Sequence, residues 1–216
     1  MINIRNVTKK YGDKTVYDNF SLDIEEGVIT AVLGESGAGK TTLLNMIAGL
    51  TDYSGEISGN IRPASMVFQQ NRLVPHLTVA ENLKLVKSDA DIESALNSVG
   101  LADYGCAYPK SLSAGMARRV ALIRAFLYPS PIILMDEPLI NLDLALKYRL
   151  TGLIKKLQKE SGRTVITVTH DIGEAVMTAG RIVVLKGGKV VFKEDAVTEE
   201  TAKRLTEVLL QNADDR

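Results

Sequence analysis

A glycine-rich segment at residues 34–41 (GESGAGKT) has the residue types and the spacing that hold a phosphate group. It follows an apolar stretch, residues 28–33, that we predict as a strand, and it precedes a helical pattern at residues 41–48. Glycines let successive backbone N–H groups curl around an anion, and the helix N-terminus adds a partial positive charge. Lys40 would reach the outer phosphates, and the Thr41 hydroxyl would bind Mg²⁺. The fixed spacing favours a phosphate-binding loop over a glycine turn with a surface lysine.

Two adjacent acids, Asp136 and Glu137, end an apolar run at residues 132–135 that is typical of a strand buried on both faces. Ligands of open parallel sheets bind at the carboxyl ends of strands, so we expect both acids to face the glycine-rich loop. Asp136 would then hold Mg²⁺, and Glu137 would orient or deprotonate a water that attacks the phosphate. Without the loop, two solvated turn acids would be the simpler interpretation.

The elements that must position these residues alternate between strand and helix in the second half of the chain. This order implies parallel crossovers and an α/β fold. Before it lie short strand patterns at residues 2–7 and 17–24, and a region from about residue 71 with helical spacing. In the second half we predict strands at residues 132–136, 164–169 and 181–185, and helices at residues 144–159 and 172–178.

The composition narrows the classes of function. A chain of 216 residues corresponds to one domain. Its 26 basic residues balance 26 acidic ones, so no overall positive field recruits nucleic acid or anionic lipid. The single cysteine, Cys106, excludes an intramolecular disulfide and fits a reducing compartment, and no apolar run approaches the ~20 residues that cross a bilayer. We expect a soluble, cytoplasmic chain with no nucleic-acid partner.

Four more short motifs accompany the glycine-rich loop and the Asp136-Glu137-Pro138 segment in a fixed order. They are Val67-Phe68-Gln69, Leu112-Ser113-Ala114-Gly115-Met116, Asn141-Leu142-Asp143 and Thr169-His170-Asp171. Over about residues 2–192 the chain resembles the nucleotide-binding subunit of an ABC transporter. The resemblance implies a P-loop NTPase core with a mainly parallel sheet, an N-terminal antiparallel β subdomain and an inserted α-helical subdomain.

The same resemblance divides the single domain, residues 1–216, into two parts. Residues 1–70 and 132–216 would form the nucleotide-binding core with its β subdomain. Residues 71–131 would form the helical subdomain that carries the signature motif, Leu112 to Met116.

The resemblance also implies ATP hydrolysis with Mg²⁺, and it assigns roles. Glu137 would be the catalytic base, His170 would contact the γ-phosphate and the attacking water, and Gln69 would lie near that water. Tyr11 would stack on adenine, although alone it would be an ordinary surface or core tyrosine. The metal ligands would be Thr41, Gln69 and Asp136. The nucleotide would be bound by Tyr11, Gly34, Glu35, Ser36, Gly37, Ala38, Gly39, Lys40, Thr41, Thr42, Ser113, Ala114, Gly115 and Asp143.

The signature motif implies a second ATPase subunit, because in this family two subunits associate head to tail and the signature of one covers the ATP of the other. Ser113, at the start of a predicted helix, would offer its hydroxyl and nearby amides to the γ-phosphate. Taken alone, it would be an ordinary helix cap. The family usually has glycine where Ala114 stands and glutamine where Met116 stands. These departures bear on closure and turnover more than on nucleotide binding.

A transport role would need separate membrane subunits and, in a full import system, a solute-binding protein. The resemblance favours bacterial importers of the nitrate, sulfonate or taurine type, with the chain bound peripherally to the inner face of the membrane. Residues 71–78, next to Gln69, are the candidate permease-docking segment, with an ordinary loop as the alternative.

Three other interpretations stay open from the sequence. A non-transport ABC ATPase would couple the same clamp to DNA, ribosomes or the cell-division machinery. A small phosphotransferase would use the loop on a metabolite and would not need the signature motif. A binding-only protein would associate with nucleotide and release no phosphate.

Overall fold

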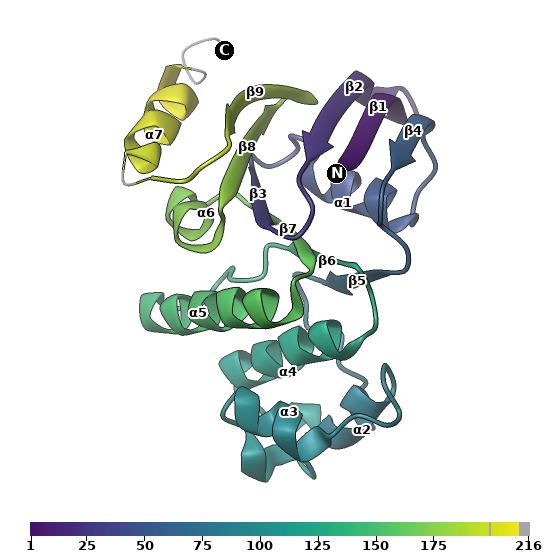
Figure 1. Ribbon diagram of the computed structural model, residues 1–216, viewed down its shortest axis with the longest axis vertical. Coiled ribbons are helices and arrows are strands. Elements are labelled where there is room, and N and C mark those ends of the chain that lie inside the picture. The colour runs from purple at the N-terminus through teal and green to yellow at the C-terminus, as the bar shows by residue number, and fades with distance from the viewer. Residues whose placement is uncertain (199, 212–216) are drawn as a thin grey trace.

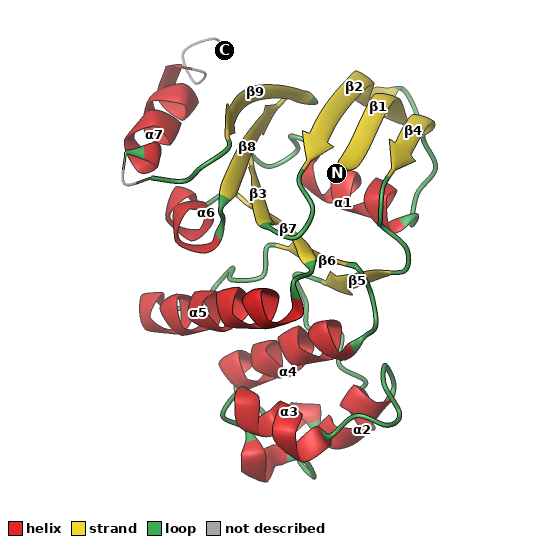
Figure 2. Ribbon diagram, in the orientation of Figure 1, coloured by secondary structure: helices red, strands yellow, loops and turns green. Residues whose placement is uncertain are grey.

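The computed structural model describes residues 1–198 and 200–211. Two sheets and seven α-helices make up this part of the chain; some of the helices gather at one end of the molecule and others lie beside the sheets (Figure 1, Figure 2). A six-stranded sheet runs through the centre, and a smaller antiparallel sheet lies beside it at the N-terminal end (Figure 1).

The central sheet has the strand order β5-β6-β7-β3-β8-β9. Its first five strands pair in parallel, and β9 pairs antiparallel with β8 through the Gly187-Gly188 turn. Apolar residues on both faces of β3, β6 and β7 explain why these strands occupy the middle of the sheet. The strands are β3 Ile29–Leu33, β5 Ala64–Val67, β6 Ile132–Asp136, β7 Thr164–Thr169, β8 Arg181–Lys186 and β9 Lys189–Glu194.

Alternate residues of the central strands point into two separate cores, as the period of two in a strand requires. On one face, Ile133 and Met135 pack with apolar residues of the helices that follow β5. On the other, Ile132 and Leu134 pack with α1 (Lys40–Ala48) and the N-terminal sheet. The sheet is therefore covered on both sides and is rigid enough to fix whatever follows its strand ends.

The N-terminal sheet has the order β2-β1-β4, all antiparallel. Its strands are β1 Ile2–Tyr11, β2 Lys14–Ile24 and β4 Ser54–Ser58. β1 extends beyond the strand predicted at residues 2–7, because Lys9 and Tyr11 pair across to β2 although this stretch lacks apolar alternation. The extension carries Tyr11 to the tip of the hairpin, opposite Lys14.

Of the helices after β5, α2 to α5 gather at the end of the molecule away from the small sheet, and α6 and α7 lie on the side of β8 and β9 (Figure 1). α2 (Val79–Lys84) starts with a capping box made by Thr78 and Glu81, and α3 (Ile92–Ser98) is capped by Asp91. α4 (Ala114–Leu127) is capped by Ser113. The remaining helices are α5 Leu144–Ser161, α6 Ile172–Thr178 and α7 Thr201–Gln211, and short 3-10 turns cover Ala102–Tyr104 and Pro109–Ser111.

This topology decides where the chemically interesting residues meet. β3, β6 and β7 are neighbours in the sheet and run in the same direction. Their carboxyl ends therefore lie at one edge of the sheet, and the chain leaves them at Gly34, Asp136 and Thr169.

Candidate functional site

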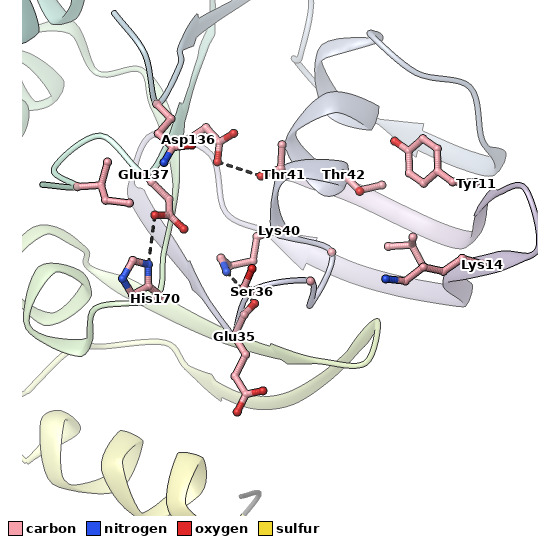
Figure 3. A pocket seen from close by; sticks show the side chains of 15 residues that line it. Tyr11, Lys14, Glu35, Ser36, Lys40, Thr41, Thr42, Asp136, Glu137 and His170 are labelled. Atoms are coloured by element: carbon pink, nitrogen blue, oxygen red, sulfur yellow. Dashed lines mark hydrogen bonds and ion pairs between the residues drawn. The ribbon is translucent and has the colours of Figure 1, made fainter. Parts of the chain in front are cut away.

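One cleft of about 810 Å³ lies at this edge of the sheet and collects most of the residues singled out from the sequence (Figure 3). Lys40, Thr41, Asp136, Glu137 and His170 point toward one another in it, and Tyr11 with Lys14 lies at its far end (Figure 3). The lining residues are Tyr11, Lys14, Val16, Glu35, Ser36, Gly37, Gly39, Lys40, Thr41, Thr42, Gln69, Asp136, Glu137, Ile140 and His170.

The glycine-rich loop is held by its surroundings. Gly39, the N-cap of α1, has φ +102°, a conformation that favours glycine. Its carbonyl accepts a hydrogen bond of 3.0 Å from the hydroxyl of the buried Tyr17 on β2. A Cβ at Gly34 would lie 2.5 Å from the carbonyl oxygen of Leu185. The loop is therefore fastened to β2 on one side and pressed against β8 on the other.

The Lys40 ammonium is buried beneath this loop. It donates to the carbonyl oxygens of Gly34 at 2.7 Å and Glu35 at 2.9 Å. Burial lowers the pKa of Lys40, and the nearby carboxylates of Glu137 and Asp136 oppose that effect. An ammonium with three N–H donors and two carbonyl partners has a donor left for a ligand oxygen.

Thr41 and Asp136 meet across the cleft, one from the start of α1 and one from the end of β6. The Thr41 hydroxyl donates to Asp136 Oδ1 at 3.1 Å. Burial raises the pKa of Asp136, the hydrogen bond from Thr41 lowers it, and the charge of Glu137 raises it further. The nearby charge of Lys40 lowers this pKa. Two hard oxygen donors, the Thr41 hydroxyl and the Asp136 carboxylate, thus converge at this point of the cleft.

Glu137 has a backbone conformation that the sequence does not predict. Its φ is +45°, a left-handed value that non-glycine residues adopt rarely and at some energetic cost. Its N–H donates to the carbonyl of Val168 on β7 at 3.0 Å. The turn directs the carboxylate to His170, whose Nδ1 lies 3.2 Å from Glu137 Oε2. The other ring nitrogen, Nε2, is not part of this contact.

The signature residues lie outside this cleft. Ser113 is exposed, and its side chain accepts from the N–H of Met116 at 3.2 Å as the cap of α4. Gly115 is buried where a Cβ would meet Leu146 at 2.6 Å. Asp143 caps α5 by accepting from Leu146 N at 2.9 Å. Ala114 lines a neighbouring cavity of about 370 Å³ together with Gln69, and Ala38 lines a third one behind the loop.

Two arginines that the sequence did not bring to notice join α4 to the segment around Gln69. Arg118 is buried and donates to the carbonyls of Phe68, at 2.7 Å, and of Gln69. Arg124 donates to the carbonyls of Asn71 at 3.1 Å and Arg72 at 3.0 Å. Burial lowers the pKa of both guanidinium groups. Their position on one predicted helix could have drawn attention to these arginines, but only the fold shows which carbonyls they bind.

Lys14 and Val16 were also missed, although they line the cleft beside Tyr11. Tyr11 is about half exposed, and the Lys9 ammonium lies 4.5 Å from the centre of its ring. Lys9 is itself buried and paired with Asp52 at 2.9 Å. The Lys9 ammonium therefore contacts the Tyr11 ring, and the end of the cleft beside this ring stays open.

Comparison with known families decides the identity of this arrangement. Residues 17–140, more than half of the chain, match the family model described as ABC transporter. The chain belongs to the ABC transporter family. It is an ATP-binding domain of the ABC ATPase type, and the resemblance seen in its motifs is confirmed.

Several relatives carry names of import systems. The chain is 39% identical over 215 residues to the aliphatic sulfonates import ATP-binding protein SsuB 3 of Paraburkholderia xenovorans, covering 97% of the chain and 86% of that protein. It is 42% identical over 210 residues to the spermidine/putrescine import ATP-binding protein PotA of Pseudomonas aeruginosa, covering 88% of the chain. The match spans only 58% of PotA.

The ABC ATPase domain also resembles solved structures. A dimeric structure of a bacterial ABC transporter cassette is 34% identical, with a TM-score of 0.78, and the match covers 92% of the chain and 99% of that structure. A dimeric post-hydrolysis structure of an ATP-binding cassette bound to ADP and Pi has the same TM-score at 32% identity. The predicted fold, with its antiparallel N-terminal sheet and mainly parallel core, is thereby confirmed. Within the described residues, no helix is both long and apolar enough to cross a bilayer.

Proposed function

We propose that this domain binds Mg-ATP, that the nucleotide closes two copies of the chain head to tail, and that hydrolysis lets them part and so drives solute import. One observation supports the proposal most strongly. The groups that would face the phosphates lie together in one cleft, whereas the signature segment of the same chain lies outside that cleft. A single chain then holds the nucleotide, and a second chain must cover it.

The residues of the cleft fit a magnesium triphosphate by their chemistry. Thr41 and Asp136 supply the hard oxygen ligands that Mg²⁺ prefers, and Gln69 lines the same cleft. Asp136 is half-buried and burial raises its pKa, while Lys40 is buried and has a free donor for a phosphate oxygen. When bound, Mg²⁺ neutralises charge on the phosphate oxygens. Glu35, Ser36, Gly37, Gly39 and Thr42 would complete the cradle.

Hydrolysis would use Glu137 and His170. The Glu137 carboxylate would accept a proton from a water whose oxygen attacks the γ-phosphorus, and the bond from that phosphorus to the β,γ-bridging oxygen would break to leave ADP and phosphate. His170 Nδ1 lies 3.2 Å from Glu137 Oε2, and Nε2 on the other side of the ring would donate to a γ-phosphate oxygen when it carries a proton. Tyr11 would stack on the adenine at the far end of the cleft.

Closure would be the energy-coupling step. Moving a pair of domains from 1:99 to 99:1 in favour of the closed state takes about 5.5 kcal/mol of differential binding. Two nucleotides, each held by the loop of one chain and by Ser113, Ala114, Gly115 and Asp143 of the other, would supply it. Removal of the γ-phosphate would withdraw that contribution. The dimeric cassettes to which the chain is similar support this arrangement.

Transport would require separate permease subunits, and the relatives named as import ATP-binding proteins support an importer with a solute-binding protein. The domain would then lie peripherally on the inner face of the cell membrane. Residues 71–78 are our candidate docking segment within a helical subdomain at residues 71–131. The buried Asn82 supports this by holding that segment through bonds to Val74 and Leu77.

The test is to measure ATP binding and phosphate release by the purified domain and by its Glu137→Gln variant. The isosteric amide cannot take the proton, so we expect binding within threefold of wild type and turnover lower by about 10²- to 10⁴-fold. Turnover at the wild-type rate in the variant would contradict the assignment of Glu137. A wild-type domain, with and without a permease, that binds no ATP would contradict the proposed function as a whole.

A further inference from the structure

Lys147 lies on α5 outside the nucleotide cleft, yet it joins α5 to the segment that carries His170. Its ammonium lies 2.9 Å from Asp171 Oδ2 and 2.7 Å from Glu174 Oε1. The hydrogen bond to Glu174 raises the pKa of Lys147, so the side chain stays charged. Glu174 is only 5% exposed, and a carboxylate so buried needs this partner.

Both neighbours of His170 are fixed by the same network. The Thr169 hydroxyl donates to Glu174 Oε2 at 2.7 Å and accepts from the N–H of Asp171 at 3.1 Å. Asp171 in turn caps α6 by accepting from the N–H of Glu174 at 3.2 Å. The backbone before and after His170 is thus bonded into one cluster whose positive charge comes from Lys147.

The imidazole itself has little else to hold it. Its side chain is 57% exposed, and among the described residues its ion-pair partner is Glu137. A ring that is not packed takes its position from its backbone. A displacement of about 1 Å at a catalytic group can cost on the order of 10²-fold in rate, so the backbone anchors of His170 matter for turnover.

We propose that Lys147 is a positioning residue for His170, acting through Asp171 and Glu174. The inference rests on the proposed role of His170 in ATP hydrolysis. The backbone N–H of Lys147 donates to the carbonyl of Asp143 at 2.9 Å, in the first turn of α5. The network therefore ties the start of α5, next to residues 141–143, to the start of α6.

The chain offers a matched control for a merely structural role. Lys155 lies on the same helix and also reaches α6, where it donates to the carbonyl of Met177 at 2.9 Å. Lys155 therefore joins α5 to the C-terminal end of α6, which is the end farther in sequence from His170. Lys147→Met and Lys155→Met each remove one bridge between α5 and α6, but only the first removes the charge that Glu174 needs.

The experiment measures kcat and KM for ATP by phosphate release, together with the imidazole NMR signals. We expect Lys147→Met to lower kcat by roughly 10- to 100-fold, with KM changed by less than about threefold. Lys155→Met should keep wild-type kcat. Because the chain has two histidines, His76 is an internal reference, and only the His170 signals should move in Lys147→Met.

Two further variants guard against a misfolded Lys147→Met protein. Lys147→Arg keeps the charge and can pair with both carboxylates, so it should retain kcat within about threefold. Lys147→Met with Glu174→Gln removes both charges and leaves no buried carboxylate unpaired, because the Asp171 side chain is 37% exposed and still accepts from the N–H of residue 174. This double variant should still show the loss of kcat. Unchanged kcat and unchanged His170 signals in this double variant would overturn the inference.

Equal losses of kcat in Lys147→Met and Lys155→Met would also overturn it, because helix bridging alone would then explain both. Failure of the proposed function has a different signature. His170→Ala with wild-type turnover would remove His170 from the mechanism, whereas loss in His170→Ala together with wild-type behaviour in Lys147→Met would reject only the positioning role.

Discussion

The strand-end cleft and the signature segment at residues 113–115 differ in how complete each is within one chain. In the cleft, Lys40 from the start of α1 converges with Asp136 and Glu137 from the end of β6, and their donors and acceptors face the cleft. At the signature segment, the polar side chain of Ser113 is used by its own helix as a cap, and Ala114 is exposed. The difference teaches that the cleft is complete within one chain, whereas the signature segment would act only on a partner that approaches it.

Among these variants, Lys40→Ala should weaken nucleotide binding in the strand-end cleft most severely. The variant removes the buried cation that would meet the outer phosphates, and charge-assisted hydrogen bonds are the strong ones. We expect nucleotide affinity to fall by about 100-fold or more, which corresponds to roughly 3 kcal/mol. Titration calorimetry with ATP checks this. The exposed Lys156, paired with Glu160 at 3.9 Å, gives a control variant, Lys156→Ala, whose affinity should not change; affinity retained in Lys40→Ala would contradict our account of the loop.

Arg118→Met should loosen the connection between the two regions. It leaves the carbonyls of Phe68 and Gln69 without their partner, so the free energy of unfolding should drop by about 1–3 kcal/mol. Turnover should fall by roughly tenfold because Gln69 loses its anchor. Hydrogen exchange at residues 68–72 reports the loosening directly.

Arg119 is the matched control for this variant. It lies on the same helix and donates to the carbonyl of Val99 at 2.7 Å, which is within the helical region. Arg119→Met should leave exchange at residues 68–72 unchanged. If both variants raised exchange there equally, α4 as a whole and not Arg118 would hold the Gln69 segment.

Ala114→Gly addresses the second region and should have the smallest effect. The Cβ of Ala114 is exposed at the first position of α4, where it would limit the approach of a nucleotide held by another chain. Its removal should raise dimer affinity or turnover by about threefold, since glycine allows a closer backbone approach. Ala117→Gly in the same helix carries the helix-propensity cost alone and should give no gain; unchanged kinetics and dimer affinity in Ala114→Gly would remove the steric argument.

The sequence predicted the parts of this molecule that depend on local pattern. The strands at residues 132–136 and 164–169 and the helix at residues 172–178 have the predicted bounds, because continuous apolar runs and helical spacing are local signals. The meeting of Lys40, Asp136 and His170 followed from the rule on strand ends. Their roles in binding and hydrolysis stay predictions.

The rest depended on contacts between distant residues. The left-handed turn at Glu137 accompanies a backbone hydrogen bond to the distant Val168, which the segment DEP alone does not reveal. The support of Gly39 by Tyr17 joins residues 22 positions apart, and Arg118 reaches 50 positions back to Phe68. Such contacts are selected by the packed fold, so pattern and spacing cannot reveal them.

The central claim is that ATP joins two copies of the domain and that its cleavage separates them. Sedimentation velocity of the Glu137→Gln variant with Mg-ATP tests it most directly. We predict a species of twice the mass of the chain with Mg-ATP, and the single chain with Mg-ADP or without nucleotide. A single chain under saturating Mg-ATP, in a variant shown to bind it, would contradict the claim.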